Sequence, residues 1–236
     1  MSGANASPIG RSQQKMKSDF GRYIDHTLLR PIGTTTDIRK LCTEAIEYGM
    51  AAVCIFPSYI PMARDILKDT RIRIATVIAF PFGVTFTEIK EAEMRASAAR
   101  GADEMDFVIN IAALKSGDDR SIEEEMQYLT AKSRTLGVHT KFIIETAYLT
   151  DDEKIRACKI ANRVKPDFMK TSTGYGPSGA TVEDVKLMRA HLLPEIQIKA
   201  AGGIRSYAEA VQMLQAGASR LGTSSGIKII EEASQK

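Results

Sequence analysis

Residues 85–110 contain one complete structural unit and have the sequence TFTEIKEAEMRASAARGADEMDFVIN. Thr85 and Glu88 have the spacing of a helix start, in which the hydroxyl accepts a hydrogen bond from a free backbone amide and the acid bonds back. Small and apolar residues then recur at helical spacing as far as Gly101, and glycine suits the left-handed turn that ends a helix. The apolar run 104–109 is predicted as a strand. The stretch therefore predicts a helix that leads through a glycine turn into a buried strand.

The same unit recurs along the chain. The other predicted strands are 51–56, 72–80, 141–145, 167–170, 196–201 and 219–222, with 23–27 as a weaker first strand. Further helix starts are expected at Ser121/Glu124, Thr150/Glu153, Thr181/Asp184 and Ser206/Glu209, and further helix ends at Gly49, Gly137 and Gly217. Eight strands that alternate with helices imply parallel pairing and right-handed crossovers. Because no GxGxxG motif directly follows any strand, we favour a single α/β domain with a closed (β/α)8 TIM barrel over an open doubly wound sheet.

Composition limits the possible partners. The chain has 236 residues, of which 44% are hydrophobic and 26% charged, and this length allows one sizeable core. The net charge is only +3 and there is no polybasic arm, so neither nucleic acid nor membrane is indicated as a partner. Cys42, Cys54 and Cys158 lie far apart without CxxC spacing, which argues against a disulfide framework and a structural zinc site. A reducing, cytoplasmic location is expected.

The first residues differ from the rest of the chain. Residues 1–18 contain four serines and no acid, a composition found in some organelle transit peptides. Pro8 and Gly10 interrupt any helix there, however, and no apolar stripe is present. We expect a flexible extension over 1–20, followed by the barrel domain over 21–236.

Two predicted strands carry a lysine where apolar residues are expected. Lys170 ends one strand and Lys199 lies in the next, and a buried ammonium group is costly unless it has a use. Strand alternation directs Lys199 toward the barrel interior, and Asp106 of an earlier strand points inward in the same way. Since neighbouring strands lie about 4.8 Å apart, the two amines are expected to converge. The alternative is that each lysine reaches solvent or simply pairs with an acid.

Convergence of the two amines would change their acidity. Two ammonium groups about 6 Å apart at an effective dielectric near 20 repel by roughly 2.8 kcal/mol. This energy corresponds to about two pKa units, and burial adds to the effect. A carboxylate such as Asp106 opposes the shift, so we expect it to lie closer to one amine than to the other. A neutral amine is a nucleophile that forms Schiff bases with carbonyl compounds.

Three glycine-containing loops follow the last strands. Gly202 and Gly203 follow the seventh predicted strand, and Ser224 and Ser225 follow the eighth, while residues 171–176 form a third loop beside Lys170. Loops at these places in a barrel often bind phosphate through backbone amides, although each one alone is only a turn. Together they favour a phosphorylated ligand.

Other candidate residues carry less information. Lys141 begins its strand, at the end opposite to the expected active site, and Glu145 either orients a water or bonds a lysine. Cys54 has no basic partner in the sequence, which favours a packed side chain over a nucleophile. Only three histidines exist, and His139 and His191 precede strands and should lie at the opposite end from the catalytic loops. No metal site is predicted.

Seven motifs in order along the chain resemble the deoxyribose-phosphate aldolase family. They are YIDHTLL at 23–29, AAVCIFP at 51–57, GADEMDFVIN at 101–110, FIIET at 142–146, MKTSTG at 169–174, IKAAGGIR at 198–205 and LGTSS at 221–225. The resemblance covers residues 21–230. The tail before it is longer than in the shorter bacterial members.

The resemblance implies a class I aldolase without a cofactor. Such an enzyme reversibly cleaves 2-deoxy-D-ribose 5-phosphate to acetaldehyde and D-glyceraldehyde 3-phosphate. A homo-oligomer, either a dimer or a tetramer, is the expected assembly. Lys170 matches the Schiff-base lysine, Lys199 the second lysine and Asp106 the proton donor and acceptor. The matching pocket and phosphate positions are Asp25, Cys54, Gly202, Gly203, Ser224 and Ser225. Two alternatives stay open, which are another enzyme of sugar-phosphate metabolism and a non-catalytic sugar-phosphate-binding barrel.

Overall fold

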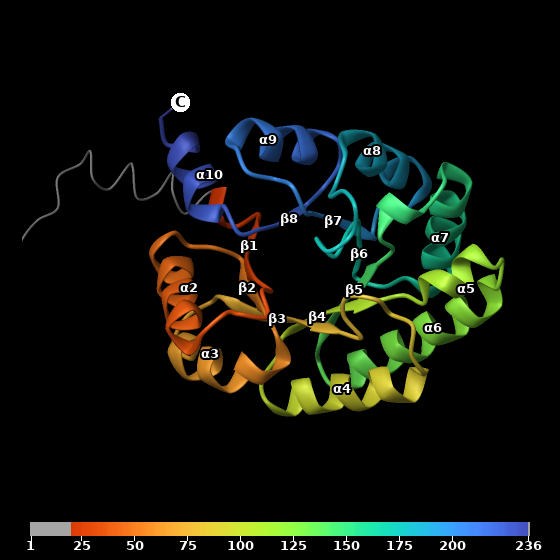
Figure 1. Ribbon diagram of the computed structural model, residues 1–236, viewed down its shortest axis with the longest axis horizontal. Coiled ribbons are helices and arrows are strands. Elements are labelled where there is room, and N and C mark those ends of the chain that lie inside the picture. Colours follow the sequence, from red (N-terminus) through yellow and green to blue (C-terminus); the bar gives the residue numbers. More distant parts are fainter. Residues whose placement is uncertain (1–19, 236) are drawn as a thin grey trace, which may run out of the picture.

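Eight parallel strands form a closed barrel in sequence order, with helices around the outside (Figure 1). The computed structural model describes residues 20–235. The strands are β1 (Ile24–Leu28), β2 (Ala52–Ile55), β3 (Arg73–Ile78), β4 (Glu104–Val108), β5 (His139–Ile143), β6 (Phe168–Lys170), β7 (Gln197–Ala201) and β8 (Arg220–Thr223). The predicted α/β class and the (β/α)8 TIM barrel are confirmed.

The helices cover the barrel from outside. They are α2 (Thr35–Glu47), α3 (Ile60–Leu67), α4 (Thr87–Ala99), α5 (Ile111–Lys115), α6 (Asp119–Thr135), α7 (Asp151–Val164), α8 (Val182–His191), α9 (Tyr207–Gln215) and α10 (Gly226–Ala233), with short 3-10 turns η1 (Pro57–Tyr59) and η2 (Thr146–Tyr148). Within residues 20–235, no helix has the length and apolar character that crossing a membrane requires. Of the predicted extension over 1–20, only Phe20 lies within the described residues, and its ring centroid lies 5.2 Å from that of Tyr207.

Three of the five predicted helix starts are confirmed. Thr150 and Ser206 form complete capping boxes at α7 and α9, and Thr181 caps α8 by accepting from the Asp184 amide. A capping box at Thr34, which starts α2, was not predicted. The predicted glycine ends are confirmed by positive φ angles of 60° at Gly49, 101° at Gly101, 69° at Gly137 and 115° at Gly217.

The other two predicted starts are wrong. The Thr85 amide donates to the Gly83 carbonyl in a tight turn, so α4 begins two residues later, after Phe86. Asp118 caps α6 by accepting from the Ser121 amide, which places Ser121 inside the helix. A short polar residue three positions earlier therefore took the role that the pattern assigned to the serine.

The strands direct alternate residues to two different environments. Met105, Phe107 and Ile109 pack in the large apolar core between strands and helices. The interior of the barrel differs from side to side. Strands β2 and β3 contribute a small apolar cluster that includes Cys54 and Val77, whereas the later strands contribute charged residues.

A buried ion pair joins helices α4 and α6 to the end of β4. Lys90 is completely buried, and its Nζ donates to Glu125 Oε1 at 2.7 Å and to the Val108 carbonyl at 2.8 Å. Burial lowers the pKa of Lys90, and the neighbouring Glu125 carboxylate opposes this. The contact with Glu125 thus compensates the burial of the Lys90 ammonium group.

Removal of one partner should therefore destabilise the barrel. For Glu125→Ala we expect a loss of about 3–5 kcal/mol in the free energy of unfolding, measured by urea titration, because Lys90 is left buried and unpaired. Glu124→Ala is the matched control, since Glu124 pairs with Arg120 on the surface at 2.7 Å and should contribute less than about 1 kcal/mol. The double variant Lys90→Met/Glu125→Leu should recover most of the loss, and equal losses in both single variants would contradict this account.

Candidate active site

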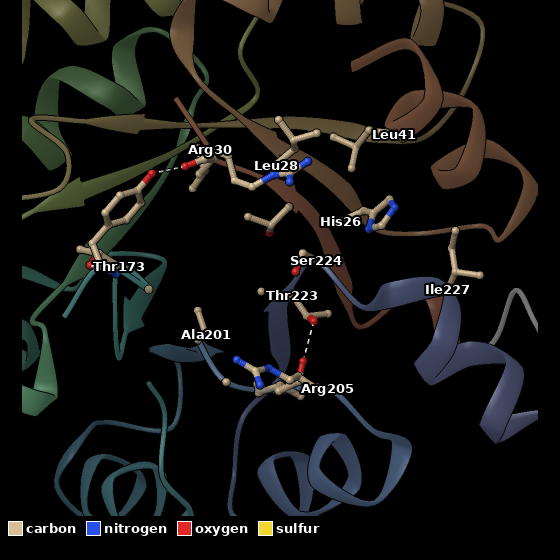
Figure 2. Close-up of a pocket in the computed structure, with 18 of the residues that line it drawn as sticks. His26, Leu28, Arg30, Leu41, Thr173, Ala201, Arg205, Thr223, Ser224 and Ile227 are labelled. Carbon is tan, nitrogen blue, oxygen red and sulfur yellow. Dashed lines mark hydrogen bonds between the residues drawn. The ribbon is translucent and has the colours of Figure 1, made fainter. Parts of the chain in front are cut away.

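A cavity with a volume of about 810 Å³ opens at the carboxyl ends of the strands (Figure 2). Lys170, the last residue of β6, lies in its wall together with Gly202, Gly203 and Ser224 from the loops after β7 and β8. The structure therefore brings the predicted amine and three of the four predicted phosphate-loop residues to one cavity.

Glycine is required at the loop that follows β7. Gly202 and Gly203 have φ angles of 85° and 80°, which lie in the left-handed region. A Cβ atom on Gly202 would also lie 3.0 Å from the Cα of Gly179. Ser225 is not in the cavity wall, but it precedes α10 and its amide donates to the Thr223 hydroxyl. Arg205, which the sequence analysis did not select, does line the cavity.

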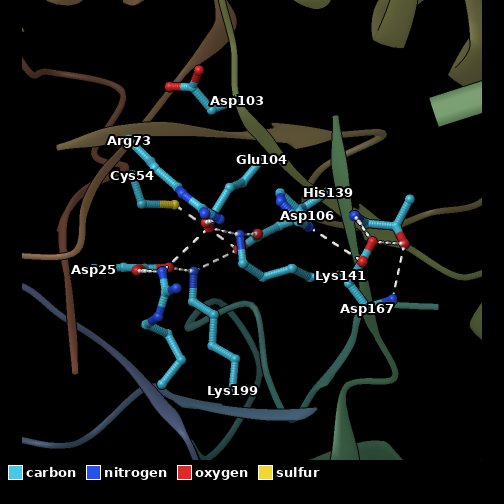
Figure 3. A network of polar contacts seen from close by, with 12 residues as sticks. Asp25, Cys54, Arg73, Asp103, Glu104, Asp106, His139, Lys141, Asp167 and Lys199 are labelled. Atoms are coloured by element: carbon cyan, nitrogen blue, oxygen red, sulfur yellow. Dashed lines mark hydrogen bonds and ion pairs between the residues drawn. The ribbon is translucent and has the colours of Figure 1, made fainter. Parts of the chain in front are cut away.

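Below the cavity, three acids and four cations fill the barrel interior. Figure 3 shows most of this network, whose members are Asp25, Glu104, Asp106, Lys141, Lys170, Lys199 and Arg220. The side chains of the acids and of Lys141 and Lys199 are completely buried, Lys170 is 3% exposed and Arg220 12%. The charges of an ion pair interact strongly in such a dry environment, because little water screens them.

Asp106 lies at the centre of this network and contacts all three lysines. Its Oδ2 accepts from Lys170 Nζ at 2.7 Å and from Lys199 Nζ at 2.8 Å, and its Oδ1 accepts from Lys141 Nζ at 2.9 Å. Lys170 and Lys199 are partners in the β6–β7 register, so the predicted convergence of the two amines is confirmed. The expectation that Asp106 lies closer to one of them is wrong, because opposite register positions present both amines to one oxygen.

A second carboxylate makes the two lysines unequal. Asp25 Oδ2 lies 2.5 Å from Lys199 Nζ, whereas no carboxylate other than Asp106 is ion-paired with Lys170 within residues 20–235. Burial lowers the pKa of Lys170, and the Lys199 ammonium lowers it further against the effect of Asp106. Burial also tends to lower the pKa of Lys199, but Asp106 and Asp25 outweigh it and raise that pKa well above its ordinary value. Lys170 is therefore the amine that loses its proton more easily.

The acids stay ionised because the neighbouring buried cations stabilise their negative charge. Burial tends to raise the pKa of Asp106, but the three lysines outweigh it and hold that pKa well below its ordinary value. Asp25 and Glu104 also have lowered pKa values, since Lys199 and Arg220 outweigh burial at Asp25 and Lys141 does so at Glu104. The network consists of anions and cations, with Lys170 as the cation that is most easily neutralised.

Lys141 was placed at the wrong end of its strand for chemistry, and the structure corrects this. Strand β5 begins two residues earlier than predicted, at His139, so Lys141 lies opposite Asp106 in the register. Its Nζ lies 2.9 Å from Asp106 Oδ1 and 2.6 Å from Glu104 Oε2. Glu104 and Arg220 were also missed as members of the network. Strand alternation places Glu104 and Asp106 on the same inner face, and that signal was available in the sequence.

Asp25 and Cys54 lie deeper than expected. Both are buried and neither is in the cavity wall, while Asp25 is held by Lys199 and by Arg220 Nη1 at 2.7 Å. Cys54 Sγ lies 3.9 Å from Asp106 Oδ2 among small apolar side chains, and burial raises the pKa of its thiol.

The remaining candidates have structural contacts. Glu145, whose φ is 51°, accepts from the Thr173 amide at 3.1 Å and from its hydroxyl, and so orders the loop after β6 instead of pairing with a lysine. His139 begins β5 at the amino-terminal end of the barrel, as predicted, and lies 3.2 Å from Asp167. His26 lines the cavity and contacts Glu44 at 2.8 Å.

Comparison with known proteins agrees with this geometry. Residues 16–232 match the family described as DeoC/LacD family aldolase. The chain belongs to this family. It is 50% identical over 217 residues to the deoxyribose-phosphate aldolase of Thermococcus gammatolerans, which covers 91% of this chain and 96% of that one.

Two further relatives support the assignment. The deoxyribose-phosphate aldolase of Carboxydothermus hydrogenoformans is 49% identical over 214 residues, or 90% of this chain and 94% of that one. Among solved structures, the tetrameric deoxyribose-phosphate aldolase of Aeropyrum pernix has a TM-score of 0.85 at 28% identity and covers 95% of this chain and 97% of that one.

The buried carboxylates predict how stability depends on pH. Their folded-state pKa values lie below ordinary ones, so the unfolded chain takes up protons first as the pH falls. We expect the free energy of unfolding, from urea titrations, to fall progressively from about pH 5 toward pH 2. Asp25→Asn should be less stable at pH 7, because Lys199 and Arg220 lose a partner, and its stability should fall less steeply with acid.

A surface aspartate provides the control. Asp69 is exposed, so Asp69→Asn should leave the acid slope close to that of the wild type. If Asp25→Asn keeps the full wild-type slope, the ion pairs of Asp25 do not contribute in the way described.

Proposed function

We propose that this chain reversibly cleaves 2-deoxy-D-ribose 5-phosphate to acetaldehyde and D-glyceraldehyde 3-phosphate. The observation that carries this proposal is that Lys170, with its lowered pKa, and the glycine loops after β7 and β8 line one cavity. An amine that is easily deprotonated suits attack on a carbonyl carbon, and the loops suit a phosphate group.

Lys170 acts as the nucleophile in this mechanism. Its neutral amine adds to the C1 aldehyde, and loss of water gives an iminium ion that accepts an electron pair. The C2–C3 bond then breaks, the C3 hydroxyl loses its proton, and an enamine remains on Lys170 while glyceraldehyde 3-phosphate departs. Protonation of the enamine at C2 and addition of water release acetaldehyde and restore the amine.

Asp106 and Lys199 supply the proton transfers. Asp106 Oδ2 contacts both lysines, so a proton that leaves one of them has a carboxylate 2.7–2.8 Å away. Lys199 stays protonated beside Asp25 and Asp106 and keeps the proton source close to the reacting carbon. Asp25 is a positioning residue, since it contacts Lys199 and not the cavity.

The phosphate end fixes the sugar. Gly202, Gly203 and Ser224 provide backbone amides and a hydroxyl, and Arg205 adds a guanidinium in the same cavity wall. Binding of the phosphate there holds the aldehyde end toward Lys170, and this orientation lowers the entropy cost of the reaction.

Trapping with borohydride tests the covalent step. With acetaldehyde and sodium borohydride, the intact mass of the wild type should rise by one ethyl group, and Lys170→Ala should show no increase. Lys199→Ala should still be labelled but should turn over roughly 10²–10⁴-fold more slowly, because the proton source is lost. The labelling rate should rise with pH and level off below the ordinary lysine value of 10.5.

A surface lysine serves as the matched control. Lys228 is 64% exposed on α10, and Lys228→Ala should be labelled and active like the wild type. Labelling of Lys170→Ala at wild-type levels would show that another amine is the nucleophile. Binding of deoxyribose 5-phosphate without product would favour the binding-barrel alternative.

We also propose a homo-oligomer and a cytoplasmic location, the latter supported by three free, buried cysteines. An apolar patch lies between β3 and α4, and its members are Phe82, Val84, Phe86 and Ile89, which are 75%, 62%, 77% and 55% exposed. The two phenylalanines alone expose roughly 300 Å², as much as the largest patch on many monomers. Each partner of a standard interface buries about 800 Å², so a second copy related by a two-fold axis fits this patch.

Charge in the patch should disrupt the oligomer. Phe86 precedes α4 in an extended conformation without a side-chain cap, so Phe86→Asp adds a charge to the patch and a capping group to the helix. In light scattering behind gel filtration, we expect the mass of this variant to fall toward that of a single chain. Ile32→Asp, at an 80% exposed position of the β1–α2 loop, should keep the wild-type mass. A wild type that is monomeric at micromolar concentration would rule out this interface.

A further inference from the structure

A second cavity lies at the opposite end of the barrel from Lys170. Its volume is about 260 Å³, and Arg73 and His139, the first residues of β3 and β5, lie in its wall. Asp103, the residue before β4, also lines it. The two cavities share no lining residue. We call this second cavity the basal pocket; Arg73, Asp103 and His139 are labelled in Figure 3.

Positive charge predominates in the basal pocket. Arg64, Arg71 and Arg73 line it against one carboxylate, that of Asp103. Asp103 is already engaged, because its Oδ2 accepts from Arg64 Nη2 at 2.7 Å and from the Ile74 amide at 2.7 Å. Arg71 and Arg73 therefore have no carboxylate partner among the residues that line the pocket.

Both guanidinium groups have N–H donors that are available to a ligand. Arg71 is exposed and makes no hydrogen bond or ion pair with any residue in the part of the chain that the structure describes. Arg73 uses Nη1 for Glu104 Oε1 at 2.9 Å, and its side chain stays 45% exposed. Guanidinium groups present parallel donors that match the oxygens of phosphate and carboxylate groups.

The barrel interior strengthens the preference for an anion. Glu104, the partner of Arg73, also neutralises Lys141 and Arg220. Counted together, the three interior carboxylates face Lys141, Lys199, Arg220 and Arg73, as well as Lys170 when that amine is protonated. The surplus is positive, and a concave site with such a surplus attracts anions.

The size of the pocket limits the ligand. Its volume of about 260 Å³ is less than a third of the 810 Å³ of the substrate cavity. This space holds a phosphate group with a few further atoms. The guanidinium group of Arg71, together with the remaining donors of Arg73, favours a doubly charged anion over a singly charged one. We propose that the basal pocket binds a compact dianion of the phosphate type, either inorganic phosphate or a small phosphate monoester, separately from the substrate cavity.

The three histidines of the chain provide a test that separates the two cavities. His139 lines the basal pocket, His26 lines the substrate cavity and His191 lines neither. In proton NMR spectra of the full chain, inorganic phosphate added at constant pH and ionic strength should shift the His139 ring signal along a saturating curve. The His191 signal should stay unchanged, and chloride should not reproduce the His139 curve.

Matched variants complete the experiment. Arg71→Gln should raise the dissociation constant for phosphate, as reported by the His139 signal, roughly tenfold, because one charge-assisted contact is lost. Lys68→Gln removes an exposed charge three residues away and outside the pocket, and should leave that constant unchanged. Methyl phosphate titrated in parallel decides the source, since tighter binding of the ester assigns the pocket to monoesters and tighter binding of inorganic phosphate assigns it to the free anion.

Some outcomes would overturn the proposal. A His139 signal that does not saturate, or an Arg71→Gln variant with wild-type affinity, would show that the arginines are only a solvated surface. If phosphate shifts the ring signal of His26 and not that of His139, it binds in the substrate cavity and the basal pocket is not a phosphate site. A His139 response without one at His26 would support the basal pocket, whatever becomes of the aldolase assignment.

Discussion

The contact of one carboxylate with three buried lysines is the constraint on which the rest of the site depends. Asp106 Oδ2 is shared by Lys170 and Lys199, and Oδ1 is bonded to Lys141. Without this anion, Lys170 would have no carboxylate partner within residues 20–235, and Lys141 and Lys199 would each keep only one, Glu104 and Asp25. An uncompensated ammonium group in a dry interior costs several kcal/mol. The closed barrel makes the arrangement possible, because inward positions of β4, β5, β6 and β7 meet there from different parts of the sequence.

The fold separates this charge from the rest of the interior. On the β2–β3 side, small apolar residues such as Cys54 and Val77 fill the barrel. On the other side, the register places Lys170 opposite Lys199 and Asp106 opposite Lys141, so that each cation has an anion on a neighbouring or facing strand. The apolar side keeps water away, and a low dielectric makes the pKa of Lys170 sensitive to its neighbours.

Much of this could be predicted from the sequence, and the failures have physical causes. Strand alternation directed Lys199 and Asp106 inward, and the strand order of the barrel placed Lys170 beside Lys199, while the separate roles of the three residues came from the family resemblance. Lys141 was misplaced because β5 begins at His139, two residues before the predicted start, which puts Lys141 in the middle of the strand and opposite Asp106. The basal pocket was not predicted, since its arginines at 64–73 meet Asp103 and His139 only after the barrel closes.

The inequality of the two central lysines follows from one further residue. Asp106 alone would treat them alike, because its distances to them differ by only 0.1 Å, 2.7 against 2.8 Å. Asp25 adds a second anion to Lys199 and is itself held by Arg220, a cation whose pKa is raised above its ordinary value despite burial. Lys199 is thus fixed as an ammonium group, and its charge in turn disfavours a second ammonium at Lys170. The division of roles between nucleophile and proton source is therefore set from the β1 side of the barrel, by a residue that does not line the cavity.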